Sequence, residues 1–90
     1  MQVYLDKSGE DIERVASALA EGDADALRRA AHSLKSSSAN VGGMALSALF
    51  KELEGLGREN RLAEVAPVFA AARREHARVS VEVRNFMAEA

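Results

Sequence analysis

The chain contains two histidines, His32 and His76, and no cysteine. The lack of cysteine excludes a disulfide framework, a thiolate metal site and a cysteine nucleophile. A solvated imidazole is mostly neutral at pH 7, and one ring nitrogen then keeps a lone pair that can attack an electrophile. The two histidines are therefore the first candidates for chemistry, and their positions on the predicted helices distinguish them.

His32 lies on a predicted helix over residues 24–41 and points away from the apolar stripe of that helix. With about 100° per residue, His32 falls about 140° from Leu27, which lies on the stripe. The outward face around the ring carries two cations and several small residues: Arg28, Lys35, Ser36, Ala39 and, if the helix continued, Gly43. Small side chains would let another protein reach the ring, so we expect this face to contact a partner.

The cations beside His32 suit the transfer of a phosphoryl group. Positioning and electrostatic stabilisation supply most of the catalysis in phosphoryl transfer, and a cation offsets the charge of the phosphoryl oxygens. Lys35 is the first candidate for this role and Arg28 the second. The plain alternative is that His32 is an ordinary surface residue.

Four amphipathic helices are predicted to position these residues, over residues 9–21, 24–41, 44–56 and 61–87. Ser8, Asp23 and Asn60 are suitable N-caps, because their side-chain oxygens can accept from free backbone N–H groups. Acidic residues such as Asp11 in the first turn would favour the start at residue 9. Gly22 is expected to stop the first helix, and Gly55 and Gly57 to fray the end of the third.

The last helix carries an apolar series spaced four and three residues apart, as in the seam of a bundle: Val65, Phe69, Ala72, Val79, Val83 and Phe86. His76 fills the gap in this series, so it is interpreted as a core or boundary residue. Pro67 predicts a kink or a helix start closer to residue 67, because proline removes one backbone hydrogen bond.

These elements predict an all-α fold, an antiparallel up-down-up-down four-helix bundle, in a single domain over residues 1–90. Apolar residues make up 48% of the chain but aromatic residues only 4%, so the core must consist mainly of leucine, valine and alanine. The loops are short, and helices joined by short loops are antiparallel neighbours.

Composition also excludes several classes of function. A net charge of −2 argues against a nucleic-acid partner. No apolar run approaches the roughly 20 residues that span a bilayer, so no direct membrane contact is expected. His32 and His76 differ in expected exposure, and no carboxylate spacing supports a metal site between them. The absence of cysteine fits a cytoplasmic location.

The stretch over residues 30–42, AAHSLKSSSANVG, resembles the signature of histidine-phosphotransfer (HPt) domains, A-H-x-L-K-G-x-[SA] followed by an apolar residue and glycine. Leu46 matches the leucine that follows four residues later. The Gly22-Asp23 pair and the Leu53-Glu54 pair are also similar to the family. The resemblance is strongest between Gly22 and Glu54 and covers most of the chain.

The resemblance implies a phosphocarrier in a His-Asp phosphorelay without kinase activity of its own. His32 would accept a phosphoryl group, through Nε2, from the aspartate of one receiver domain and pass it to another. Lys35 matches the lysine that contacts the phosphoryl group. No cofactor is implied, because Mg²⁺ is expected on the receiver only. We expect a monomeric module, from the C-terminal end of a hybrid sensor histidine kinase.

Ser36 departs from the family pattern, which has glycine directly after the lysine. Glycine lets the receiver approach closely, so the serine affects the geometry of docking and not the identity of the acceptor. Two alternatives remain open at this point. One is a helical adaptor that binds a partner without phosphorylation. The other is the dimerisation segment of a sensor kinase, whose histidine is followed by an acidic residue, whereas Ser33 follows His32 here.

Overall fold

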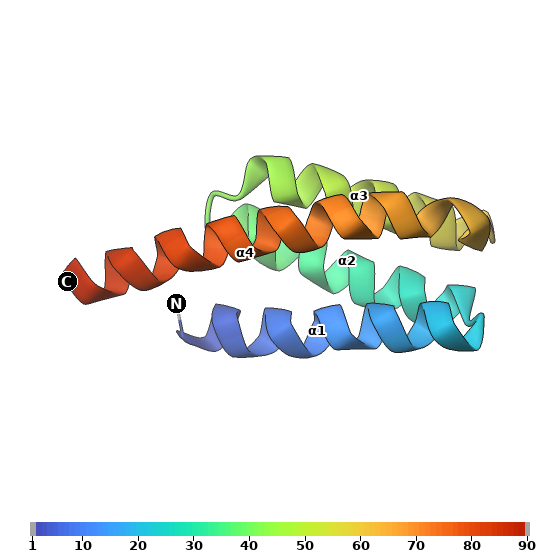
Figure 1. The fold of residues 1–90 in the computed structure, drawn as a ribbon, viewed down its shortest axis with the longest axis horizontal. Coiled ribbons are helices and arrows are strands. Elements are labelled where there is room, and N and C mark those ends of the chain that lie inside the picture. Colours follow the sequence, from blue (N-terminus) through green and yellow to red (C-terminus); the bar gives the residue numbers. More distant parts are fainter. Residues whose placement is uncertain (1, 90) are drawn as a thin grey trace.

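The computed structural model describes residues 2–89 as four α-helices in chain order: α1 (Gln2–Glu21), α2 (Ala24–Asn40), α3 (Met44–Arg58) and α4 (Val65–Glu89). A short 3₁₀ helix, η1 (Leu62–Glu64), leads into α4. Successive helices run in opposite directions and lie side by side in a body of 42 × 19 × 18 Å (Figure 1). The all-α up-down bundle predicted from the sequence is confirmed.

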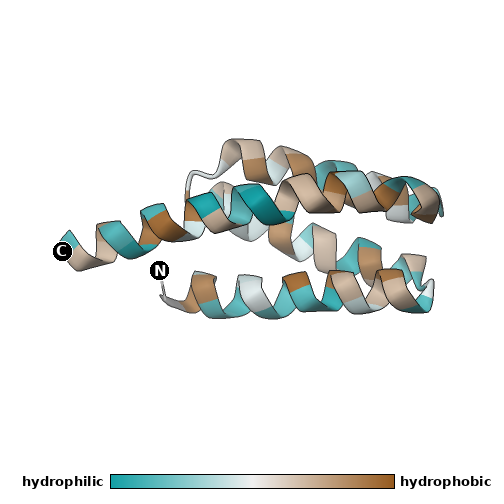
Figure 2. Ribbon diagram, viewed as in Figure 1, coloured by the Kyte–Doolittle hydropathy of each residue, from teal (hydrophilic) through white to brown (hydrophobic). Residues whose placement is uncertain are grey.

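The core consists of apolar side chains that recur at helical spacing on all four helices. Figure 2 shows hydrophobic and hydrophilic positions alternating along each helix, as amphipathic helices require. Phe50 is the largest fully buried side chain, and most of the other buried apolar side chains are leucine, valine and alanine, as the composition predicts. Among residues 3–89, these are the buried apolar side chains nearest to zero exposure: Val15, Leu27, Ala31, Leu34, Leu46, Phe50, Leu53, Val65 and Ala72.

Helix α1 begins at Gln2, seven residues before the predicted start. Ser8 is therefore not an N-cap but an interior helix residue, fully buried against α4. Asp11 is likewise not in a first turn, and only 2% of its surface is exposed. The prediction was wrong because Tyr4 continues the apolar stripe of Ile12 and Val15 upstream, with the small Ser8 between them.

The other helix ends follow the sequence signals in part. Asp23 caps α2 as predicted, since its side chain accepts from the Ala26 N–H at 3.0 Å. Asn60 does not cap α4; it adopts a positive φ of 57° and helps to end α3. Helix α4 begins at Val65, so Pro67 lies in the first turn, where its missing N–H costs no helical hydrogen bond. The later start near Pro67 is the alternative that holds.

The C-terminal turns of α4 project beyond the other three helices (Figure 1). Phe86 lies on this projection, and 61% of its surface is exposed. Its predicted place in the core seam is therefore wrong, although Val79 and Val83 of the same series are buried. The periodicity of a helix cannot show where its neighbours end.

Gly57 brings the end of α3 close to the start of α2. A Cβ atom at this position would lie 3.0 Å from the Ala24 carbonyl oxygen and 3.1 Å from the Arg28 backbone nitrogen. The prediction that the helix frays at Gly55 and Gly57 is wrong, because α3 continues through both glycines to Arg58. Because Gly57 has no side chain, α3 can approach α2, the helix that carries His32, at this end of the bundle.

Replacing Gly57 with alanine is expected to destabilise the fold by about 1–3 kcal/mol, because two backbones must separate to admit the methyl group. Gly55→Ala is the matched control, since a Cβ there meets nothing within 4 Å. The control should gain up to about 1 kcal/mol from helix propensity. Urea unfolding midpoints of the two variants would measure both effects, and equal midpoints would contradict the close-approach argument.

Candidate functional site

His32 lies in the middle of α2, and 60% of its side chain is exposed. The outward orientation predicted for the ring is therefore confirmed. A hydrogen bond fixes the orientation of the ring, because Nδ1 lies 2.7 Å from Oε2 of Glu54 on α3. One ring nitrogen thus faces the protein, and the other, Nε2, is left for solvent or a partner.

Glu54 is a nearly buried carboxylate, 5% exposed, at the edge of the apolar face of α3. The Lys35 ammonium donates to its Oε1 at 2.8 Å. Lys35 lowers the pKa of Glu54 most, and His32 lowers it further, although burial opposes both effects. Glu54 is therefore ionised at neutral pH and can only accept hydrogen bonds. In the neutral form of the His32 ring, Nδ1 must then carry the proton, and the lone pair lies on Nε2.

One further contact holds α3 in register with this part of α2, and another lies within α3 itself. Ser47 donates its hydroxyl proton to the backbone carbonyl of Lys35 at 2.9 Å. Arg58, one turn after Glu54, places a guanidinium nitrogen 3.6 Å from Glu54 Oε2. The carboxylate of Glu54 is thus approached by three basic side chains from two helices.

The remaining predicted positions fall into two groups. Ser36 and Ala39 are exposed on α2, as expected for a surface that a partner can reach. Gly43 is half-buried and does not extend this face, because α2 ends at Asn40 and a Cβ on Gly43 would lie 3.2 Å from the Ser38 carbonyl oxygen. Arg28 pairs with Asp25 at 2.9 Å on its own helix, so its guanidinium already has an anionic partner.

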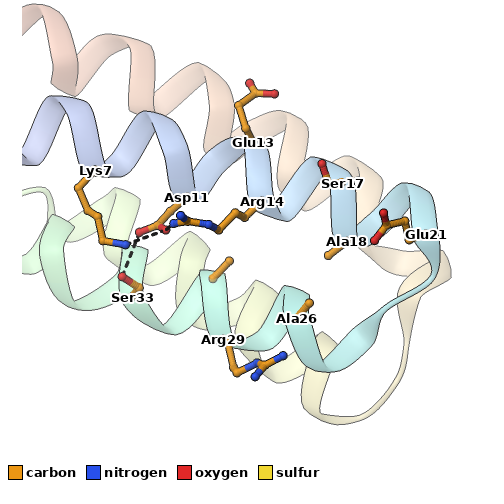
Figure 3. A pocket seen from close by; sticks show the side chains of 11 residues that line it. Lys7, Asp11, Glu13, Arg14, Ser17, Ala18, Glu21, Ala26, Arg29 and Ser33 are labelled. Carbon is orange, nitrogen blue, oxygen red and sulfur yellow. Dashed lines mark hydrogen bonds and ion pairs between the residues drawn. The ribbon is translucent and has the colours of Figure 1, made fainter.

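A buried carboxylate also ties α1 to the residue after His32. Asp11 accepts from the Ser33 hydroxyl at 3.0 Å and from Arg14 and Lys7 at 2.6 and 3.2 Å. Figure 3 shows these four side chains converging at one end of a groove of about 520 Å³ between α1 and α2. The groove is not lined by His32. Asp11 and Glu54 therefore fix α2 from opposite sides, next to the exposed ring.

The sequence identified Glu54 only as half of a pair that resembles the family. It assigned no role to Arg58, and it gave Asp11 only a place in the first turn of the first helix. A usable signal exists for Glu54. It lies four residues after Phe50, on the face of α3 that turns inward, and a carboxylate there requires a basic partner. Arg58, at i+4 from Glu54, follows from the same reasoning. Asp11 also requires a basic or hydroxyl partner, because it lies on the inward face of α1 once this helix is extended to Gln2.

His76 is half-buried between α4 and α1, as its place in the seam predicts. Its Nε2 lies 2.9 Å from the Ser8 hydroxyl, and its ring centroid lies 6.3 Å from that of Tyr4. Burial lowers the pKa of His76 most, and the charges of Arg84 and Arg73 lower it further. His76 is thus a neutral packing residue with a satisfied ring nitrogen.

The lowered pKa of His76 predicts a loss of stability in acid. The unfolded chain binds a proton at a higher pH than the folded chain, so this contribution is complete above the ordinary histidine pKa and is lost as pH falls through the folded value. We expect the Tm of the wild type to fall more between pH 8 and pH 5 than that of His76→Gln. Parallel Tm curves for the two proteins would contradict this expectation.

Within the part of the chain that the structure describes, no three histidine, cysteine or acidic side chains form a metal-binding group. No described helix has the length and apolar character needed to cross a membrane.

The fold and site together define a bundle that presents one oriented, exposed imidazole, held from behind by a buried carboxylate. The model of the Hpt (histidine-phosphotransfer) domain family matches residues 1–88, and the chain belongs to this family. Hpt domains are phosphocarriers that interact with receiver domains in phosphorelays, lack kinase activity and need no cofactor. Comparison with curated proteins and with solved structures gives no match.

Proposed function

We propose that His32 is the phosphoryl acceptor of this Hpt domain and that it reacts through Nε2. The hydrogen bond between His32 Nδ1 and Glu54 carries the proposal. An ionised Glu54 holds the proton on Nδ1, so the lone pair on Nε2 points outward from an exposed ring. His76 offers no equivalent, since its Nε2 is engaged with the buried Ser8.

The transfer step follows from this arrangement. The Nε2 lone pair attacks the phosphorus of a receiver aspartyl phosphate, a P–N bond forms, and the P–O bond to the aspartate breaks with the electron pair leaving on its carboxylate. The ring keeps its Nδ1 proton and becomes cationic. Glu54 faces this positive charge at 2.7 Å, so it stabilises the cationic phosphohistidine that forms. In the reverse direction the electron pair of the P–N bond returns to Nε2, and the ring leaves as neutral imidazole with its proton still on Nδ1.

Lys35 is proposed to act on the phosphoryl group as well as on Glu54. Its ammonium has three donors, and one of them bonds to Glu54. The other donors are available to phosphoryl oxygens, because 29% of the side chain is exposed. The exposed Ser36 and Ala39 leave room beside the ring for the receiver surface. An origin in a hybrid sensor kinase, a cytoplasmic location and a monomeric state remain predictions.

The test is phosphoryl transfer from a phosphorylated receiver to this domain, followed by mapping of the label. We expect an acid-labile, alkali-stable phosphate on the peptide that contains His32. Absence of label with several receivers, together with tight binding of a helical or receiver partner, would favour the adaptor alternative. Label on another residue would contradict the assignment of the acceptor.

A further inference from the structure

We propose that Arg58 is a second cation that binds the phosphoryl group once it is attached to His32. The inference rests on the proposed role of His32, and it replaces Arg28, which the sequence favoured, with a residue of α3. The guanidinium would exchange a loose contact with Glu54 for direct contacts with the phosphoryl oxygens.

The position of Arg58 follows from one shared atom. Glu54 Oε2 lies 2.7 Å from His32 Nδ1 and 3.6 Å from a guanidinium nitrogen of Arg58. The guanidinium is therefore one carboxylate oxygen away from the imidazole ring. Its contact with Glu54 is longer than a hydrogen bond, and 64% of the Arg58 side chain is exposed. Arg58 is near the ring but only loosely held.

The other basic side chains of this face are held more tightly. Lys35 donates to Glu54 at 2.8 Å. Arg28 bonds to Asp25 at 2.9 Å, and Arg29 lies 3.3 Å from the same carboxylate. A ligand that arrives at Nε2 would have to break these pairs to recruit Arg28, whereas Arg58 loses little by moving.

Phosphorylation changes which anion attracts Arg58 more strongly. A phosphoryl group brings a charge of about −1.5 to −2 and three acceptor oxygens. The planar fork of a guanidinium matches two of these oxygens at once. Glu54 carries a single charge that Lys35 and the His32 ring already share. Arg58 therefore moves toward the phosphoryl group, while Lys35 and the ring proton keep Glu54 in place.

The test uses phosphoramidate as the donor, so that no receiver contacts are involved. The P–N bond of the donor breaks, ammonia leaves, and a new P–N bond forms at His32 Nε2. The wild type is compared with Arg58→Gln and Arg58→Lys. Arg74→Gln is the matched control, since it removes the same charge from an exposed position of α4.

Two readouts are expected to respond to Arg58. In ³¹P NMR titrations, Arg58→Gln should raise the pKa of the phosphoryl group, because the dianion loses a neighbouring cation. The rate of phosphorylation should fall about fivefold, in keeping with one partly exposed charge-assisted contact. Arg58→Lys should lie between the two, and Arg74→Gln should match the wild type in both readouts.

The outcomes separate this inference from the proposed function. If the wild type is labelled on His32 but its phosphoryl pKa is the same in Arg58→Gln and Arg74→Gln, the role of Arg58 is refuted and the acceptor stands. If the wild type is not labelled on His32, the proposed function itself fails. Equal changes in Arg58→Gln and Arg74→Gln would show an effect of net charge and would also overturn the inference.

Discussion

His32→Gln is expected to abolish phosphoryl transfer to the domain, with no label above background. Glutamine has no ring nitrogen with a lone pair, so it cannot form the P–N bond. Its amide nitrogen can still donate to Glu54, and the side chain replaced is 60% exposed. The stability should therefore change by no more than about 0.5 kcal/mol, as for other surface substitutions. Incubation of wild type and variant with a phosphorylated receiver, followed by detection of acid-labile label, measures the loss.

The second histidine provides the internal control. His76→Gln should keep full labelling, because His76 contacts Ser8 inside the α1–α4 interface and has no part in the proposed step. Circular dichroism of both variants checks that the helices are intact. Label that persists in His32→Gln and disappears in His76→Gln would move the acceptor to α4. It would also refute the assignment of the exposed face of α2.

The fold could be predicted from the sequence wherever a helix depends on its own residues. The apolar series on α2 and α3, the Asp23 cap and the Gly22 stop are local signals, and Gly22 indeed has the positive φ of 70° that favours glycine. The start of α1 was missed because Ser8 looks like a cap in isolation. Only the packed structure shows that its hydroxyl bonds to His76, on a helix far along the chain.

The site divides in the same way. The exposure of His32 follows from its angle on a single helix, so the sequence was sufficient. The pairing of His32 with Glu54 joins two helices, and it depends on the register between α2 and α3. That register is set by contacts such as the close approach at Gly57 and the bond from Ser47 to the Lys35 carbonyl. Helical periodicity contains no information about either contact. The sequence therefore showed that the Leu53-Glu54 pair resembles the family, but it did not show what Glu54 does.

Glu54→Gln is expected to slow phosphoryl transfer about 100-fold, the size of effect seen when one preorganised electrostatic partner is removed from a reacting group. The amide keeps the shape of the side chain but loses the charge that faces the cationic ring at 2.7 Å. It also no longer holds the proton on Nδ1, because an amide can either accept from or donate to that nitrogen. Single-turnover transfer from a phosphorylated receiver measures the rate.

A purely structural role for Glu54 would predict something different. Glu54→Gln would then lower the Tm and slow transfer only as far as the domain unfolds. The proposed role predicts that ¹⁵N NMR of His32 in the folded variant shifts from the Nδ1–H form toward a mixture with Nε2–H. Glu52→Gln, at an exposed position two residues earlier on α3, is the control for lost charge and should change neither the tautomer nor the rate. If Glu54→Gln folds and keeps the wild-type tautomer and transfer rate, the carboxylate has no part in the mechanism. Nucleophilicity at His32 would then depend on exposure alone.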